Sequence, residues 1–276
     1  MPVTARRHIR KMRGGAQSHL IQASDNQFYV VKFRNNPQHR RILVNELIAA
    51  EILAHLQIPA PASELIRVPE EFLRENPEAL IQLGSQSLTP ECGWAFGSRY
   101  PGDPNITAIY DFVPDSLLTQ VENRDQFLSV LAFDKWTGNA DGRQAIFFRA
   151  RLKEWAPQTK AGPKKLGFVA LMIDHGFIFN GPHWNFTESA LQGLYPRRMV
   201  YAPVRSLKDF EPCLGRILNF PDEVLDRALR HIPPDWIDQE EEELDRLLET
   251  LMRRKKRVGE LLEQSAAAFV NWKKGG

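Results

Sequence analysis

Residues 133–148 read FDKWTGNADGRQAIFF, a stretch that concentrates polar side chains between two apolar elements. Asp134, Asn139 and Asp141 fall between an apolar helical pattern and an apolar β-like run. Phosphoryl transfer needs an acid to orient the attacking hydroxyl, and oxygen ligands to hold magnesium. The stretch is therefore typical of a catalytic loop. A helix capped by Gly138 and followed by an Asn-Ala-Asp-Gly turn would account for the same residue types.

A further carboxylate follows an apolar strand pattern. Residues 168–176 read FVALMIDHG, so Asp174 emerges from a strand into a turn. Mg²⁺ takes carboxylate and amide oxygens from separate elements that converge with substrate phosphates. We therefore expect Asp174 to bind metal, with an ordinary Asx turn as the alternative. We expect His175 to be a structural, hydrogen-bonding residue.

Upstream, the run YVVKF places Lys32 inside an apolar strand, where an unpaired ammonium would be costly and should meet an anion such as a phosphate. Glu46 lies on the helix expected from Arg41 to Gln57. Kinases hold a strand lysine with a glutamate on the next helix to orient the α and β phosphates. The alternatives are an outward-facing strand lysine and a solvated helix glutamate.

The pattern of elements changes near Pro104. The runs SHLIQA and QFYVVKF, separated by Asp25-Asn26, predict a β-hairpin before the helix. Two further strands are expected, from Ala62 to Val68 and in the run CGWAFGSRY. The first part of the chain is thus predicted to be a small sheet with one helix.

The second part is predicted to be mainly helical. A helix starts at Pro114-Asp115-Ser116, and a strongly apolar one runs from Asp125 to Trp136. The runs AIFFRA and GFVALMI predict a hairpin whose long tip lies around Gln158 to Lys165. The last helix is expected to open at Asp238, with Glu241 at capping-box spacing. Its apolar face carries Leu244, Leu248, Leu251, Val258 and Leu262.

Composition limits the classes of partner. The 36 Lys and Arg against 34 Asp and Glu give a net charge of +2, so nucleic acid is not the default partner. Basic segments at Arg6 to Arg13, expected as a flexible arm, and at Arg253 to Arg257 keep DNA or protein binding open, but neither has interleaved aromatic residues. Cys92 and Cys213 stand far apart, which fits the reducing cytoplasm. The longest apolar stretch, 168–173, is far below the roughly 20 residues that span a bilayer.

Read in order, VVKF, NELIAAEIL, NADGRQAIFF and MIDHGFIF resemble the HipA-like kinases, in particular the branch with an IDHG motif, from about Ser18 to Ala268. The resemblance implies an α+β, protein-kinase-like fold with two lobes. It also implies transfer of phosphate from ATP to serine or threonine of proteins, and some members of the family are bacterial toxins. The lobes would be an N-lobe over 1–103, with the nucleotide-binding sheet and helix, and a C-lobe over 104–276, forming one kinase-like unit.

Carried over by position, the resemblance assigns a role to each candidate residue. Asp141 would be the catalytic-loop aspartate, and Asp174 would bind the metal in the DFG-like place. Nucleotide binding would involve the lysine with its helix partner and a loop over the phosphates, namely Lys32, Glu46, Gly14, Gly15 and Ser18. That loop departs from the pattern G-x-G-x-x-G.

The catalytic loop departs from the family as well. Asn is expected five residues after Asp141, where this chain has Ile146, which makes Gln144 the candidate for the missing amide, with Asn139 as a further metal ligand. A rival alignment takes Asp134 as the base and Asn139 as the metal ligand. It ranks second because the apolar helix pattern still includes Asp134.

We therefore expect a cytoplasmic phosphotransferase that uses ATP and Mg²⁺ and acts on a protein or small molecule. The alternatives are a nucleotide-binding pseudokinase or regulatory scaffold, and a DNA- or protein-binding regulator without catalysis.

Overall fold

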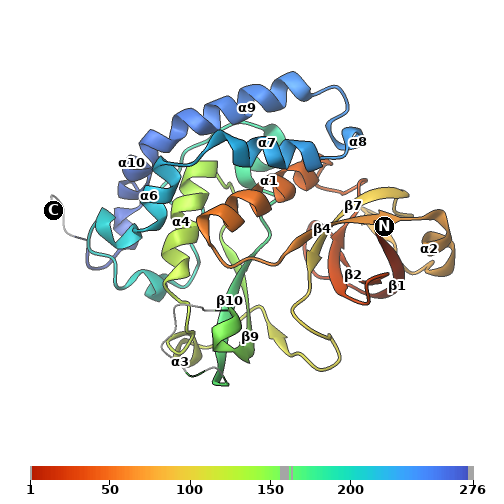
Figure 1. The fold of residues 1–276 in the computed structure, drawn as a ribbon, viewed down its shortest axis with the longest axis horizontal. Helices are drawn as coiled ribbons and strands as arrows, with labels where there is room; N and C mark the ends of the chain where they lie inside the picture. The colour runs from red at the N-terminus through yellow and green to blue at the C-terminus, as the bar shows by residue number, and fades with distance from the viewer. Residues whose placement is uncertain (1, 156–161, 163, 273–276) are drawn as a thin grey trace.

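The computed structural model describes residues 2–155, 162 and 164–272. A β-barrel lobe carries the N-terminus, and a larger, mainly helical lobe carries the C-terminal region at the opposite end of the molecule (Figure 1). The tip expected around Gln158 to Lys165 lies largely outside the described residues.

The smaller lobe is a closed barrel in which the strands neighbour one another in the order β1-β2-β3-β7-β4. The predicted hairpin is formed by β2 and β3, because Asn26 adopts φ 62° and the Ala23 amide donates to the Gln27 carbonyl at 2.9 Å. The other two predicted strands are also present. The elements of this lobe are β1 (Val3–Lys11), β2 (His19–Ala23), β3 (Phe28–Lys32), β4 (Ser63–Val68), α2 (Glu70–Glu75), β5 (Ile81–Leu83), β6 (Gln86–Leu88) and β7 (Gly93–Arg99).

The basic N-terminal segment is a strand, which corrects the expectation of a flexible arm. β1 pairs antiparallel with β2 and parallel with β4, and the register shifts twice along its pairing with β2. Ala5 is buried inside the barrel, whereas Arg6, Arg7, Arg10 and Lys11 are exposed. Backbone pairing on both edges therefore orders a segment whose side chains lack the apolar alternation of a typical strand.

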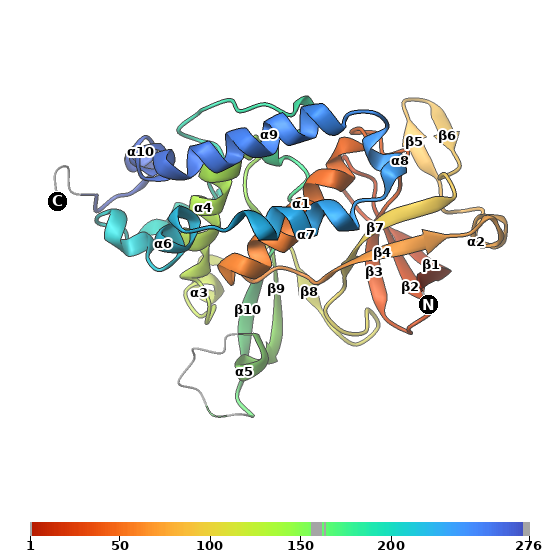
Figure 2. The same ribbon diagram turned by 45° about the horizontal axis from the view of Figure 1, so that its top comes forward.

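Helix α1 (Arg41–Leu56) confirms the predicted helix and joins the two lobes. Its buried residues lie on all sides of the helix, because it packs against β7 of the barrel and also against the helical lobe (Figure 2). Leu43, Leu47 and Ile52 belong to the large core that also contains the helices of the second lobe. The division near Pro104 stays a prediction, because this helix precedes it in sequence and shares the core that follows it.

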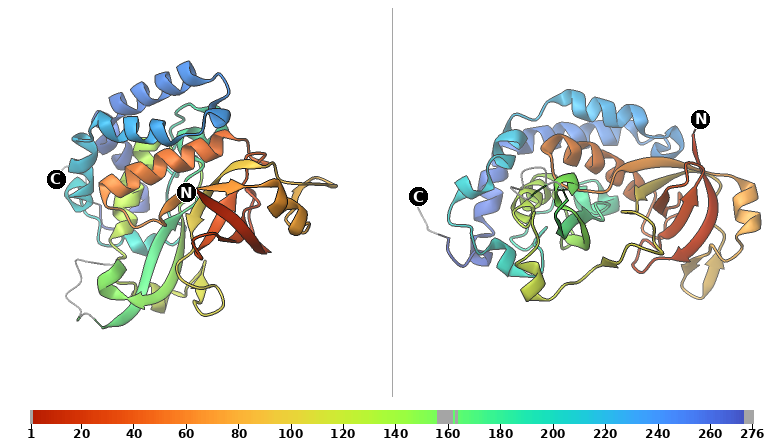
Figure 3. Two further views of the ribbon diagram at one scale, coloured as in Figure 1. Left: turned by 45° about the vertical axis from the view of Figure 1, so that its right-hand side comes forward. Right: turned by 60° about the horizontal axis from the view of Figure 1, so that its bottom comes forward.

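The larger lobe is built around helix α4 (Gln126–Thr137), which confirms the expected apolar helix and ends at Gly138 in the left-handed conformation, φ 64°. A sheet in the order β10-β9-β8 extends from this lobe (Figure 3). Strands β9 (Gln144–Arg151) and β10 (Leu166–Ile173) form the predicted hairpin, in which Gln144 pairs with Ile173. This register brings the start of β9 beside the end of β10.

The remaining elements cover this framework. They are β8 (Ile109–Tyr110), α3 (Asp115–Leu118), α5 (Leu152–Trp155), η1 (Ile178–His183), η2 (Arg198–Tyr201), η3 (Leu207–Phe210), α6 (Cys213–Leu218), α7 (Asp222–His231), α8 (Pro234–Ile237), α9 (Glu241–Arg254), η4 (Lys255–Arg257), α10 (Val258–Glu263) and η5 (Ala266–Ala268).

The expected start of the last helix is wrong. Asp238 adopts the left-handed conformation at the end of α8, and α9 begins at Glu241 without a side-chain cap. The capping box occurs instead at Ser206 and Asp209, at the start of η3. The predicted apolar residues Leu244, Leu248, Leu251, Val258 and Leu262 are all buried. They do not lie on one helix, because α9 ends at Arg254 and Val258 and Leu262 belong to α10.

Candidate functional site

Three charged side chains from distant segments meet between the lobes. Lys32 ends β3, Glu46 lies on α1, and Asp174 directly follows β10. The Lys32 Nζ donates to Glu46 Oε1 and, at 2.8 Å, to Asp174 Oδ1. The Lys32 and Glu46 side chains are buried, whereas the Asp174 side chain is 31% exposed. The structure thus brings together three of the residues that the sequence singled out.

The charges of this cluster influence one another. Burial alone would lower the pKa of Lys32, but Glu46 and Asp174 raise it above its ordinary value. Burial raises the pKa of Glu46 despite the opposing effect of Lys32. Burial would also raise the pKa of Asp174, yet Lys32 holds it below its ordinary value. A charged lysine and a charged Asp174 therefore face each other near neutral pH.

Backbone geometry fixes the position of Asp174. This residue adopts φ 58°, a conformation that non-glycine residues rarely occupy and that often marks functional sites. The His175 amide donates to Glu46 Oε1 at 3.1 Å. A Cβ on Gly176 would lie 2.4 Å from Ile42 Cγ2, so only glycine allows α1 to approach this turn so closely. The turn after β10 is thereby locked to the helix that carries Glu46.

His175 is buried, as expected for a structural histidine. One ring nitrogen lies 3.1 Å from the Met172 carbonyl oxygen and the other 3.1 Å from Arg143 Nη1. Burial, followed by the charge of Arg143, lowers its pKa well below the ordinary value. A neutral imidazole therefore supports the turn after β10 through its contacts with Met172 and Arg143.

The turn between α4 and β9 presents Asp141 and Gln144 to the same place. Asp141 is exposed, and its Oδ2 lies 3.4 Å from Gln144 Nε2. The same amide nitrogen donates to Asp174 Oδ2 at 3.1 Å. Gln144 therefore lies between the predicted catalytic and metal-binding carboxylates, a proximity that follows from its pairing with Ile173.

Asp134 and Asn139 lie in the interior instead. Asp134 has no exposed surface, and both its oxygens accept hydrogen bonds from the buried guanidinium of Arg143. Asn139 donates to Asp134 Oδ1 at 2.9 Å and accepts from the Asp141 amide at 3.1 Å. The structure therefore does not bring Asn139 to Asp174, and its geometry disfavours the rival alignment with Asp134 as base.

Sequence reasoning missed Arg143, because a lone arginine in a polar turn resembles a solvated residue. In the structure it also donates to the Ile173 carbonyl at 2.8 Å, which ties the polar turn to the end of β10. A cation two residues after Asp141, between two apolar runs, was the available signal.

A cavity of about 160 Å³ opens beside the Lys32 cluster. Ser18 lines it, together with Arg13 from the loop between β1 and β2, but Gly14 and Gly15 do not. Sequence analysis missed most of the lining, because strand residues such as Ile146 and Ile173 look like ordinary core. The full lining comprises Met12, Arg13, Ser18, Val30, Lys32, Glu46, Pro61, Phe96, Ser98, Arg99, Tyr100, Pro101, Ile109, Gln144, Ile146, Ile173 and Asp174.

The donor atoms near Asp174 fit a hard cation held partly by its substrate. Among the described residues, no three His, Cys, Asp or Glu side chains group closely enough to hold a metal by themselves. Asp174 offers a carboxylate, and Gln144 would offer its amide oxygen after rotation of the amide group. Mg²⁺ is typically bound by one or two carboxylates together with water and phosphate oxygens, so this donor set is compatible with it.

Comparisons with known proteins give the fold and the family of the chain. No curated protein sequence matches the chain. A structure of hydra Fam20 with sugar is similar at a TM-score of 0.55 and 14% identity, covering 98% of this chain and 86% of that one. This likeness shows a shared fold, the two-lobed kinase-like α+β fold.

A Golgi casein kinase structure has a TM-score of 0.49 and 11% identity, with 97% of this chain and 72% of that chain covered. Another with Mn/ADP bound has a TM-score of 0.47 and 12% identity, with 98% and 73% covered. The model of the HipA-like kinase family matches residues 6–147, slightly more than half of the 276 residues. The resemblance to the HipA-like kinases is therefore confirmed over these residues, whereas the branch with the IDHG motif, at 173–176, stays a prediction. The chain belongs to the HipA-like kinase family.

Proposed function

We propose that this chain is a phosphotransferase that uses ATP and Mg²⁺ to phosphorylate serine or threonine of a protein. The observation that carries the proposal is the convergence of Lys32, Glu46 and Asp174 from three separate segments at one cavity. Asp141 lies beside them, because Gln144 is close to both Asp141 and Asp174. Membership of a kinase family gives this arrangement its chemical meaning.

In this proposal Lys32 binds the α and β phosphates. Glu46 keeps the ammonium in place, because its Oε1 also accepts the His175 amide and its side chain is buried. Asp174 is the partner that can release the lysine, since it is more exposed and its second oxygen faces Gln144. Phosphate oxygens would take the place of one carboxylate contact, so the lysine never lacks an anion.

Asp174 and Gln144 would hold the metal, which when bound neutralises charge on the phosphates. Asp141 orients the acceptor hydroxyl and accepts its proton as the oxygen attacks the terminal phosphorus of ATP, while the bond from that phosphorus to the bridging oxygen breaks and ADP leaves. Its Oδ1 accepts a hydrogen bond from the Gly142 amide at 2.7 Å, which leaves Oδ2 directed toward Gln144.

Nucleotide entry requires movement near the mouth of the cavity. Its volume of about 160 Å³ is below the roughly 300–1,000 Å³ of typical ligand pockets. Residues 12–18 form the wall that can open, because this loop is exposed or half-buried along most of its length. Gly14, with φ 118°, supplies a backbone conformation that other residues rarely adopt, and Gly15 and Ser18 complete the proposed cover over the phosphates.

We also propose a cytoplasmic location. It is supported by the two cysteines, because Cys92 is exposed, Cys213 is buried and both are free thiols. In the part of the chain that the structure describes, every helix is too short or too polar to cross a lipid bilayer.

A pseudokinase is the second candidate, favoured by one observation. Ile146 lines the cavity at the position where the family has a metal-binding amide. Gln144 lies beside Asp174 but currently directs its nitrogen toward it. If Gln144 does not rotate to present its oxygen, the chain would bind nucleotide without transferring phosphate.

Calorimetry of Mg-ATP binding, followed by a radiolabelled transfer assay, separates these functions. Lys32→Ala should weaken Mg-ATP binding roughly 10- to 100-fold, because it removes a charged hydrogen-bond donor to phosphate. Asp141→Asn should leave affinity within a few-fold and reduce turnover by about 10²-fold, because the aspartate acts mainly in the transition state. Lys208→Ala, at an exposed site, is the control for the lysine change.

A parent protein that binds Mg-ATP but labels neither itself nor added proteins would establish the pseudokinase. Unchanged Mg-ATP binding by both Lys32→Ala and Glu46→Ala would refute nucleotide binding at this site.

A further inference from the structure

The turn between α4 and β9, which carries Asp141 and is hereafter the catalytic turn, is contacted by residues 184–197. These residues connect η1 to η2 and are hereafter the brace segment. The Gly193 amide donates to the Asp141 carbonyl at 3.2 Å, and the Arg143 amide donates to the Leu194 carbonyl at 3.2 Å. A Cβ on Gly193 would lie 2.3 Å from Asp134 Cβ, so the Gly193 backbone lies directly against the Asp134 side chain. The position of Asp141 therefore depends on where the brace segment lies.

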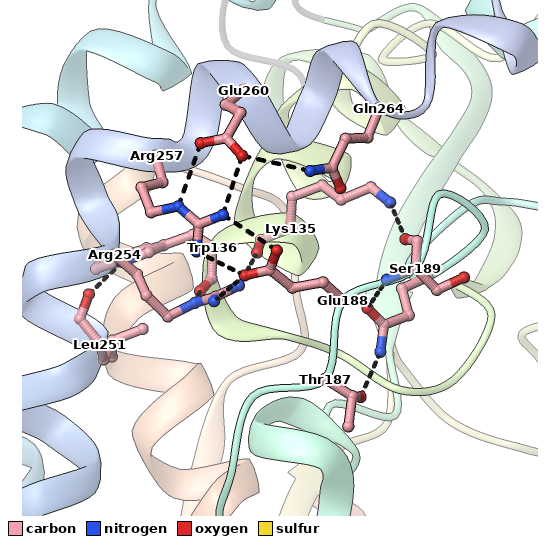
Figure 4. A network of polar contacts seen from close by, with 11 residues as sticks. Lys135, Trp136, Thr187, Glu188, Ser189, Leu251, Arg254, Arg257, Glu260 and Gln264 are labelled. Carbon is pink, nitrogen blue, oxygen red and sulfur yellow. Dashed lines mark hydrogen bonds and ion pairs between the residues drawn. The ribbon is translucent and has the colours of Figure 1, made fainter.

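One carboxylate anchors this segment to the helices behind it. Glu188 Oε1 accepts from Arg254 Nη1 and from Arg257 Nη1, each at 2.8 Å, and Oε2 accepts from Arg257 Nη2 at 3.1 Å. Figure 4 shows both arginines converging on Glu188. Hydrogen bonds from Arg257, and then from Arg254, lower the pKa of Glu188, so its charge persists at neutral pH.

Arg254 extends the same anchor to helix α4. Its Nε donates to the Trp136 carbonyl and its Nη2 to the Lys135 carbonyl, both at 3.2 Å. These carbonyls belong to the last turn of α4, where the helix leaves them without intrahelical partners. One buried guanidinium thus joins Glu188 to the helix that ends directly before the catalytic turn.

Further donors hold the backbone of the segment. Lys135 Nζ donates to the carbonyls of Ser189 and Ala190, at 2.9 and 3.1 Å, and Ser265 Oγ donates to Ala190 at 2.7 Å. Burial lowers the pKa of Lys135 to about 8. The brace segment is thus fixed by cations and a hydroxyl on one side, and contacts the catalytic turn on the other.

We propose that Glu188 is a positioning residue, which through Arg254 and Arg257 holds the brace segment so that Gly193 and Leu194 fix the turn that carries Asp141. This inference rests on the proposed role of Asp141. Many kinases order a loop near the catalytic site through a phosphorylated side chain paired with arginine. Here a glutamate carries the negative charge permanently, so the segment is ordered without modification.

The test compares Glu188→Gln with Glu249→Gln in the full-length protein. Glu249 is a matched control, because it is an exposed glutamate that also pairs with an arginine of α9, namely Arg253. This pair lies within α9 and does not involve the brace segment. In Glu188→Gln, kcat should fall at least about tenfold because Asp141 loses its alignment. KM for ATP should stay within about twofold, because Lys32 and Glu46 lie on other elements.

Hydrogen exchange gives a readout that does not depend on catalysis. The amides of Arg143 and Gly193 should exchange faster in Glu188→Gln than in the parent and in Glu249→Gln. Arg257→Gln, at a half-exposed site outside the core, should change both readouts in the same direction and by less, because Arg254 still holds Glu188. The double variant should resemble Glu188→Gln alone, since both changes act through one pair.

Unchanged exchange at Arg143 and Gly193 in a folded Glu188→Gln protein would overturn the inference. If Glu188→Gln instead raised KM for ATP by the factor expected for the fall in kcat and left kcat unchanged, the inference would also be overturned. If the parent transfers no phosphate, the proposed function fails, while faster exchange in Glu188→Gln still supports the bracing. Should Glu188→Gln fail to fold, Arg257→Gln decides by the same exchange measurement.

Discussion

At the scale of single residues, the site depends on two carboxylates that differ in how firmly they are held. Glu46 is buried on α1 and also accepts a backbone amide. Asp174 is partly exposed, has a left-handed backbone conformation and faces Gln144 with its second oxygen. The first can only orient Lys32, whereas the second can exchange partners. This difference is the basis for proposing structural support for Glu46 and metal binding for Asp174.

Asp174→Asn should therefore abolish the effect of Mg²⁺ on nucleotide affinity. The amide keeps the shape of the side chain but loses the charge that attracts a hard cation. Calorimetry of ATP binding with and without Mg²⁺ measures the effect, and the melting temperature reports on the fold. An undiminished response to Mg²⁺ would exclude Asp174 from the metal site, while loss of folding would favour a purely structural turn.

Individual site residues were predictable where a charge interrupts an apolar pattern. Lys32 inside a strand and Asp174 after one carry that signal directly. The placement of Gln144 was not predictable from periodicity, since it follows from the β9–β10 register. Asn139 and Asp141 are both polar and close in sequence, yet Asn139 is buried and Asp141 is exposed. The path of the turn decides which of the two side chains enters the core, and the sequence pattern does not show that path.

At the scale of elements, the barrel end nearest α2 contains a buried pair of histidines. His19 on β2 has no exposed surface, and its Nδ1 lies 3.0 Å from Nε2 of His8 on β1. The other nitrogen of His8 lies 3.0 Å from Glu78 Oε1. Burial, and then the proximity of His8 and Lys11, lowers the pKa of His19 from 6.5 to about 4.

The barrel should therefore lose stability in mild acid. Between pH 6.5 and about 4 the unfolded chain binds a proton at His19 that the folded chain does not. The free energy of unfolding should fall across this window by on the order of 3 kcal/mol from this residue. Urea unfolding at several pH values should give a shallower pH dependence for His19→Gln than for the parent. If the two pH dependences were parallel, His19 would take up its proton at the same pH in the folded barrel as in the unfolded chain.

Elements were predictable where side-chain periodicity and turn residues agree. The β2–β3 hairpin, α1 and α4 satisfy this condition. β1 does not satisfy it, because residues 3–13, which are β1 and the two residues after it, contain five Lys and Arg. Pairing with β2 and β4 overrides this weak local preference for a strand. The capping-box prediction at Asp238 failed because the α8–α9 connection places that residue at a helix end instead.

At the scale of the whole molecule, ion pairs tie the start of α1 to the beginning of α9. Arg41 donates to both oxygens of Glu240, at 3.0 and 2.9 Å, and to Glu243 at 2.6 Å. Its guanidinium also lies 4.3 Å from the Trp184 ring centre. The Arg41 side chain is only 11% exposed, so water and salt screen these contacts less than those of a surface pair.

Arg41→Met should lower the free energy of unfolding by about 1–3 kcal/mol, because it removes the hydrogen bonds of a charged donor to Glu240 and Glu243 and leaves only the longer contact of Arg40 with Glu240, at 3.7 Å. Arg253→Met is the control, since its pair with Glu249 at 3.6 Å is exposed and should contribute less than about 0.5 kcal/mol. Urea unfolding at pH 7 measures both. Equal losses in the two variants would contradict a special role for the Arg41 contacts.

The packing of helix α1 also determines how the chain can be divided into fragments or exchanged with a related kinase. The helix carrying Glu46 buries 11 of its 16 residues, and most of its contacts are with the helices that follow the barrel in sequence. A fragment ending at residue 103 would expose this apolar surface and should aggregate. The barrel strands β4 and β7 follow α1 in sequence, so a single division of the chain cannot separate the barrel from this helix. Exchange of the barrel between related kinases would therefore need two junctions, one between β3 and α1 and one between α1 and β4.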